Sequence, residues 1–357
     1  METVPVALPF HEPYVTAAGT LERREMVLLR IAAGDGLEGW GDAVPLSLRG
    51  GASLATVRSA IDECCAPLLV GSALDRDALL DSCEAGSVPP PALAGVDAAL
   101  LDLVGKASGE PAWRILGAGS AASVSCNGTL GAGTPADIAK TAATLAERGF
   151  ETLKIKVGMG EDLERVRAVR DAVGAPMKLR VDANGTWSVA TAIELLIEME
   201  LIGLELAEQP CATSEELAAL GARINIPIVA DENVASVADA ARVADLGACD
   251  AAAIKLAKVG GVRNALAIAA ILPTYLSSAL DSALGIAVAV HAAQALPTGD
   301  EEDGFVAGLA HGLATSNLFA DDVADNGALE GPAIEPPTTP GLGVEVDRDA
   351  VERLRIP

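Results

Sequence analysis

Positive charge is scarce in this sequence. Its 357 residues include 25 lysines and arginines against 50 aspartates and glutamates, which gives a formal net charge of −25. So acidic a surface repels the phosphates of nucleic acids and the headgroups of anionic lipids. The composition therefore argues against nucleic acid and membrane as partners, and we attribute the excess of acids to solubility.

Long apolar stretches and paired cysteines are also missing. No run approaches the roughly 18 uninterrupted apolar residues of a membrane span. The first residues, METVPVALPFHEPY, lack the basic start and the apolar core of a signal peptide. No two of the six cysteines form a CxxC pair, so we expect buried thiols in a reducing compartment and a cytoplasmic protein. The cysteines are Cys64, Cys65, Cys83, Cys126, Cys211 and Cys249.

A repeating unit is present from about Ser123 onward. Seven short apolar runs each end in polar residues, and a helical stretch follows each run. One polar residue from the end of each run gives the series Thr129, Lys156, Asp182, Glu208, Asp231, Lys255 and Ser278, with spacings of 27, 26, 26, 23, 24 and 23 residues. A strand–helix unit of about 25 residues, repeated in this way, predicts a β/α barrel. We expect an eighth strand near Gly312–Leu318.

The two flanks of the barrel have a different pattern. Residues 1–60 alternate as strands do, and the chain then becomes helical through Asp97–Val104. The tail contains GPAIEPPTTPGLG, whose prolines cannot continue a helix. We predict an α+β capping domain at residues 1–120, a catalytic barrel at 121–319, and a segment at 320–357 that returns to the cap. The chain is long enough for both units.

Three acids occupy the ends of consecutive predicted strands: Asp182, Glu208 and Asp231. Active sites of β/α barrels lie at this end of the strands. A single carboxylate there could simply cap the next helix. Three that converge would repel one another unless a cation lay among them. Oxygen ligands of this kind favour Mg²⁺, and Mn²⁺ could substitute for it.

Lysines gather in two strand-end motifs. The chain has only seven lysines, and four of them lie in KIK and KLAK, namely Lys154, Lys156, Lys255 and Lys258. The use of lysine at these positions in an arginine-rich chain indicates a need for a cation that can lose its proton, which arginine cannot do. A surface role stays open for Lys258. The three histidines, His11, His291 and His311, have no spacing that suits a metal site, and we interpret them as structural.

These motifs together resemble the muconate-lactonizing branch of the enolase superfamily. They are KIK at 154–156, DAN at 182–184, EQP at 208–210, DE at 231–232 and KLAKVGG at 255–261. The resemblance implies a modified TIM barrel with an α+β cap, and Asp182, Glu208 and Asp231 as ligands of Mg²⁺. It also implies that Lys156 and Lys255 face each other across a small carboxylate substrate, with Lys154 assisting Lys156. Enzymes of this superfamily remove a proton next to a carboxylate and stabilise the resulting enediolate with the metal.

Within that branch, residues 277–297 and 311–322 look most like o-succinylbenzoate synthases of menaquinone biosynthesis. These lyases dehydrate a cyclohexadiene carboxylate to an aromatic ring. The resemblance implies that Lys156 removes the proton and helps the hydroxyl to leave, while Lys255 stays charged. It places Asn184, Ser277 and Ser278 at the substrate.

Other activities remain open. N-acylamino acid racemases and muconate-type cycloisomerases share almost every motif. Dipeptide epimerases carry an Asp-x-Asp pair at the last strand, where this chain has Thr315-Ser316-Asn317. A Schiff-base aldolase would need no cluster of acids and would survive chelation. An inactive binding protein is disfavoured because both lysines and all three acids are present.

Overall fold

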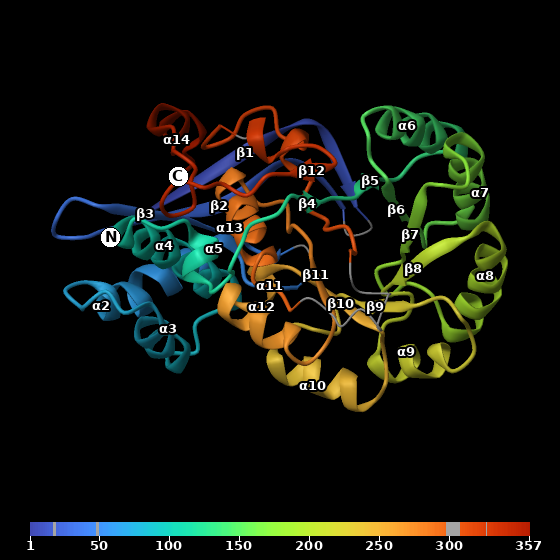
Figure 1. Ribbon diagram of the computed structural model, residues 1–357, viewed down its shortest axis with the longest axis horizontal. Helices are drawn as coiled ribbons and strands as arrows, with labels where there is room; N and C mark the ends of the chain where they lie inside the picture. The colour runs from blue at the N-terminus through green and yellow to red at the C-terminus, as the bar shows by residue number, and fades with distance from the viewer. Residues whose placement is uncertain (17–18, 48–49, 298–307, 326) are drawn as a thin grey trace.

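The computed structural model describes residues 1–16, 19–47, 50–297, 308–325 and 327–357. At the N-terminal side an antiparallel sheet has the order β1-β2-β3 (Figure 1). Its strands are β1 (Glu2–Thr16), β2 (Gly19–Ala32) and β3 (Glu38–Ala43). The helices of this part are α1 (Leu54–Ser59), the π-helix η2 (Ala60–Cys65), α2 (Ala66–Leu69), α3 (Arg76–Ala85), α4 (Pro90–Ser108) and α5 (Ala112–Ile115).

Helix α4 lies unusually close to β3 because glycines line the contact. A Cβ atom added to Gly41 would lie 2.4 Å from the carbonyl oxygen of Gly95, and one on Gly39 would lie 2.1 Å from that of Ala99. Only glycine permits two backbones to approach in this way. The GWG sequence at 39–41 is therefore a packing motif between a strand and a helix.

The second unit is a curled parallel sheet with the order β11-β10-β9-β8-β7-β6-β5. Its strands are β5 (Gly128–Leu130), β6 (Thr152–Lys156), β7 (Lys178–Asp182), β8 (Leu204–Glu208), β9 (Ile228–Ala230), β10 (Ala251–Ile254) and β11 (Thr274–Leu276). The helices around it are α6 (Pro135–Glu147), α7 (Asp162–Val173), α8 (Val189–Ile202), α9 (Ser214–Gly221), α10 (Val237–Asp245), α11 (Leu256–Val259), α12 (Val262–Ala269) and α13 (Ala283–Ala293). The predicted β/α barrel with a separate cap is confirmed.

Several barrel helices begin at a hydroxyl residue that closes the preceding loop. The side chains of Thr134, Ser188 and Ser236 accept hydrogen bonds from the first turns of α6, α8 and α10. Thr213 and Glu216 form a reciprocal capping box at the start of α9. These caps satisfy amide groups that the helix itself leaves unpaired.

The eighth strand position is shorter than the sequence predicts. His311 forms a parallel bridge with Cys126, and Gly312 forms one with Ser277. These two residues join the edges of the seven-stranded sheet, and Ser316–Leu318 is a 3-10 helix, η3. The expectation of a strand through Gly312–Leu318 is therefore wrong in extent. A second 3-10 helix, η4, spans Gly327–Leu329.

The lumen of the barrel is filled in layers. An apolar layer below the strand ends consists of Leu206, Val229, Ala251, Ala253, Tyr275 and Leu309. Side chains two residues further along each strand share its face and point into the same lumen. Two residues beyond Leu206 and Val229 lie Glu208 and Asp231, so the apolar layer lies directly below these two acids. On β7 the residue two positions before Asp182 is the buried Arg180.

The C-terminal segment returns to the N-terminal sheet. Strand β12 (Ala333–Ile334) pairs with β4 (Val124–Ser125), and α14 (Arg348–Leu354) packs beside β1 (Figure 1). Arg355 bridges to Val6, and the amide of Ile356 donates to the carbonyl of Pro5 at 3.0 Å. The boundaries at residues 120 and 320 stay a prediction. None of the described helices has the length and apolar character needed to cross a membrane.

Candidate active site

Three buried carboxylates lie at consecutive strand ends. Asp182 ends β7, Glu208 ends β8, and Asp231 directly follows β9. Asp182 pairs with Glu208 in the register of the two strands, and each of the three residues is at most 1% exposed. The structure thus places the acids at one end of the barrel, as the sequence predicted.

The lysines of β6 neutralise two of these acids. The Nζ atom of Lys154 donates to both carboxylate oxygens of Glu208 at 3.0 Å and lies 3.2 Å from Oδ2 of Asp182. The Nζ atom of Lys156 donates to the same Oδ2 at 2.6 Å. The side chain of Lys156 is 23% exposed and that of Lys154 only 7%, so Lys156 is the more accessible of the two to solvent.

Two further lysines hold the third acid. Lys255 follows β10 and donates to Oδ2 of Asp231, while Lys258 donates to Oδ1 at 2.6 Å. The side chain of Lys258 is only 13% exposed. Lys258, for which the sequence left a surface role open, therefore belongs to the ion cluster.

Burial and neighbouring charges oppose each other throughout the cluster. Burial disfavours the carboxylates of Asp182 and Asp231, but the adjacent lysines outweigh it and hold the pKa of both below the usual range. Burial and the charge of Asp182 raise the pKa of Glu208. Burial also opposes the Lys154 ammonium, yet Glu208 and Asp182 hold its pKa well above the usual range. Among the three acids, Glu208 is the one whose pKa the surroundings raise.

The donor chemistry of the three acids suits a hard divalent cation, since all are carboxylates shielded from water. As the described side chains are placed, no three of the candidate ligands surround a common point closely enough to hold an ion. Each carboxylate is turned toward an ammonium group instead. The assignment of Asp182, Glu208 and Asp231 as ligands of Mg²⁺ or Mn²⁺ therefore stays a proposal.

Asn184 lies beside the exposed lysine of β6. Its Oδ1 accepts from Nζ of Lys156 at 3.0 Å, and its Nδ2 donates to Glu232 at 3.0 Å. The backbone of Asn184 has a φ of 46°, a left-handed conformation that asparagine tolerates better than most residues. The structure places Asn184 where it orients Lys156, and contact with substrate stays a prediction.

Ser277 and Ser278 directly follow β11, at the same end of the barrel as the acids. Ser277 bridges to Gly312, and its amide donates to the carbonyl of Ile254 at 2.8 Å. The hydroxyl of Ser278 donates to Asp281 at 2.9 Å and accepts from the amide of Leu280 at 2.9 Å. Ser278 is thus engaged in its own turn. The predicted role of both serines in binding substrate is untested.

Sequence reasoning missed Tyr275, which extends from β11 into the lumen. Its hydroxyl donates to Oε2 of Glu208 at 2.6 Å, and the residue is 1% exposed. The only available signal was its position, because Tyr275 precedes Ser277 by two residues and so shares its face of the strand.

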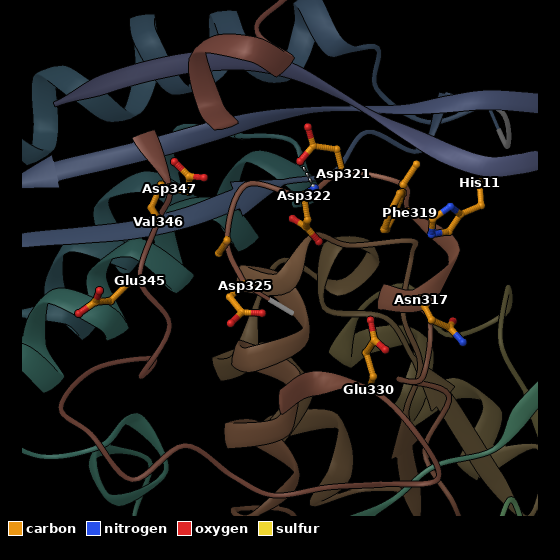
Figure 2. A pocket seen from close by; sticks show the side chains of 12 residues that line it. His11, Asn317, Phe319, Asp321, Asp322, Asp325, Glu330, Glu345, Val346 and Asp347 are labelled. Carbon is orange, nitrogen blue, oxygen red and sulfur yellow. Dashed lines mark hydrogen bonds between the residues drawn. The ribbon is translucent and has the colours of Figure 1, made fainter. Parts of the chain in front are cut away.

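A separate cavity of about 730 Å³ lies between β1 and the C-terminal segment (Figure 2). The acids that line it are Asp321, Asp322, Asp325, Glu330, Glu345 and Asp347. It contains none of the strand-end lysines, so it is distinct from the ion cluster.

Two regions of the chain match known families. Residues 1–117 match the N-terminal domain of mandelate racemase and muconate lactonizing enzyme, and residues 137–350 match the family described as enolase C-terminal domain-like. The L-Ala-D/L-Glu epimerase of Clostridium acetobutylicum is 34% identical over 95% of this chain and 96% of its own. The o-succinylbenzoate synthase of Mycolicibacterium smegmatis is 46% identical, over 50% of this chain and 54% of its own.

Solved structures share the whole fold. The muconate lactonizing enzyme of Pseudomonas fluorescens in complex with muconolactone is 29% identical, with a TM-score of 0.92 over 99% of this chain and 98% of its own. The dipeptide epimerase of Enterococcus faecalis, in complex with Mg and the dipeptide L-Leu-L-Tyr, is 28% identical, with a TM-score of 0.89 over 96% of this chain and 98% of its own. The chain therefore belongs to the enolase superfamily, with the N- and C-terminal domains of the mandelate racemase and muconate lactonizing enzyme family.

Proposed function

We propose that this enzyme is a metal-dependent dehydratase of the o-succinylbenzoate synthase type, a carbon–oxygen lyase that acts in menaquinone biosynthesis. The observation that carries the proposal is the set of uncharged residues that follows the eighth strand position. Thr315, Ser316 and Asn317 stand there, where a dipeptide epimerase would carry acids to hold the ammonium group of its substrate. The 46% identity to an o-succinylbenzoate synthase supports the same assignment.

The two partly exposed lysines lie on opposite sides of the lumen. Lys156 ends β6 and Lys255 follows β10, and these strands are four positions apart in the sheet order. In a ring of eight positions that separation is half the circumference. The side chain of Lys255 is 15% exposed and that of Lys156 is 23% exposed, so both side chains are partly accessible to solvent.

A bound divalent cation would supply electrostatic stabilisation of negative charge on the substrate carboxylate. Lys156 takes the proton from the neighbouring carbon and returns a proton to the departing hydroxyl on the same face. Asn184 holds Lys156 in position through its Oδ1 atom. Lys255 stays protonated and stabilises the anionic ring from the opposite face.

Racemisation or epimerisation is the second candidate. It is favoured by the epimerase from C. acetobutylicum, which aligns along 95% of the chain. In that chemistry each lysine must both take and give a proton, one on each face of the carbon. The same two lysines would serve either reaction, so the substrate decides between them.

The decisive experiment presents both substrate classes to the purified protein with Mg²⁺. Incubation with the cyclohexadiene substrate should produce the ultraviolet absorption of the aromatic product, and prior chelation should abolish it. A panel of N-acylamino acids and dipeptides in deuterium oxide should show much slower exchange at the α carbon. Fast exchange without any aromatic product would overturn the proposal in favour of the second candidate.

A further inference from the structure

Tyr275 reaches Glu208 across the lumen of the barrel. The phenol on β11 donates to Oε2 of Glu208, which ends β8, at 2.6 Å. Both side chains are almost completely buried, at 1% and 0% exposed. Lys154 donates to both oxygens of the same carboxylate at 3.0 Å. Glu208 is thus held from two sides.

Arg180 fixes the ring that carries this hydroxyl. Its guanidinium carbon lies 5.0 Å from the centroid of the Tyr275 ring, and the residue is fully buried. Nε of Arg180 donates to Glu205 at 2.5 Å and Nη1 donates to the carbonyl of Ala310 at 2.6 Å. Because two hydrogen bonds hold the guanidinium, the tyrosine ring packs against a side chain that is itself fixed.

The tyrosine makes the two oxygens of Glu208 unequal. Among the described contacts Oε2 accepts from Lys154 and Tyr275, whereas Oε1 accepts from Lys154. We propose that Tyr275 is a positioning residue for the candidate metal centre, which fixes Oε2 of Glu208 and leaves Oε1 as the oxygen offered to a divalent cation. This inference rests on the proposed function, since it takes Glu208 as a metal ligand.

A purely structural role would predict something else. A buried phenol needs a hydrogen-bond acceptor, and Glu208 could serve only to satisfy it. In that case loss of the hydroxyl would lower the stability of the metal-free protein and leave metal affinity unchanged. Groups that orient a metal ligand instead change metal affinity, by about 10–100-fold on removal. The two roles are therefore separable by measuring affinity and stability on one variant.

The test uses Tyr275→Phe, which removes one oxygen atom and keeps the ring on Arg180. Calorimetric titration of the substrate-free full-length protein with MnCl₂ and with MgCl₂ should show affinity about 10–100-fold below that of the wild type. The melting temperature in excess chelator should stay close to that of the wild type. Tyr14→Phe removes the same atom from the only other tyrosine and should retain wild-type metal affinity.

Turnover gives a second, independent reading. The concentration of Mg²⁺ that half-saturates activity should rise in Tyr275→Phe, while kcat at saturating Mg²⁺ should stay near that of the wild type. Metal affinity within twofold of the wild type would overturn the inference, and so would a loss of affinity that accompanies a collapse of the metal-free melting temperature. A wild-type protein that binds neither cation would overturn the proposed metal-dependent function together with it.

Discussion

Two lysines of the ion cluster, Lys156 and Lys255, have different roles in the proposed dehydration. Lys156 must exchange a proton, whereas Lys255 needs only its charge. Arginine keeps a positive charge but does not exchange a proton in this pH range. We expect measurable residual dehydration in Lys255→Arg and much less in Lys156→Arg, by roughly 10²-fold or more, the magnitude of general base catalysis.

The informative quantity is the ratio of kcat/KM between the two variants on the same substrate. Both should lose some activity because a guanidinium is bulkier than an ammonium group. Their circular dichroism spectra and melting curves serve as controls for folding. Equal activities, or a more active Lys156→Arg variant, would show that the roles are assigned wrongly.

Asp42 carries a buried carboxyl at the contact between the N-terminal sheet and the barrel. Its Oδ2 accepts from the amide of Ser282 at 3.0 Å and from its hydroxyl at 2.6 Å, just before α13. Burial and the charge of Asp281 raise the pKa of Asp42 to about 7. The folded state therefore holds this proton more tightly than the unfolded state, and its contribution to stability declines as the pH rises from about 4 through 7.

Asp42→Asn removes this titration and keeps an oxygen for Ser282. Between pH 4 and pH 8 the free energy of unfolding of the variant should rise relative to that of the wild type by on the order of 3 kcal/mol. Thermal unfolding at a series of pH values measures this difference. A difference between Asp42→Asn and the wild type that stays constant with pH would contradict the argument.

Residue types at strand ends were the most predictable part of the site. The acids and lysines were predicted because few lysines are present and because polar residues recur at nearly constant spacing. Tyr275 and the contact of Lys258 with Asp231 could not be predicted in the same way. The contact of Tyr275 depends on which strands lie across the lumen from each other, and sheet curvature sets this rather than local pattern. The contact of Lys258 depends on the short helix α11, which follows β10 and turns Lys258 back toward the end of the neighbouring strand β9.

The packing of α4 on β3 makes a prediction about a pair of elements. Gly41→Ala would force a methyl group against the carbonyl of Gly95 at 2.4 Å, so strand and helix must separate. Overpacking of this kind costs about 1–3 kcal/mol. The melting temperature should fall, while Gly34→Ala, which meets nothing within 4 Å, should leave it nearly unchanged. An unaffected Gly41→Ala protein would mean that the two elements can move apart freely.

Strand prediction succeeded where a full apolar run precedes a polar end, as in β6, β7 and β8. It failed in extent at the eighth position, where His311 and Gly312 are the described residues that bridge to the neighbouring edges. Two residues are too few to show the alternation of apolar and polar side chains by which a strand is recognised in a sequence. The π-helix Ala60–Cys65 was equally invisible, because its sequence is compatible with an ordinary helix.

Metal binding should stabilise the molecule as a whole. A ligand that binds only the folded state, at 100 times its dissociation constant, adds about 2.7 kcal/mol. We expect Mg²⁺ to raise the melting temperature by several degrees and chelation to reverse the rise. KCl at equal ionic strength is the essential control, because a chain of net charge −25 is also stabilised by screening. Equal rises in both salts would count against a specific site, as would a full response in Glu208→Gln.

Pairing between the two ends of the sequence has a consequence for biosynthesis. The β1 residues Pro5 and Val6 lie at the edge of their sheet and bond to Ile356 and Arg355. A ribosome adds about 5–20 residues per second, so β1 leaves the exit tunnel roughly 20–70 s before these partners. During that interval β1 exposes an unprotected strand edge, which is prone to pairing with other chains. Conditions that slow translation should therefore increase the aggregation of nascent chains more than that of the finished, refolding protein.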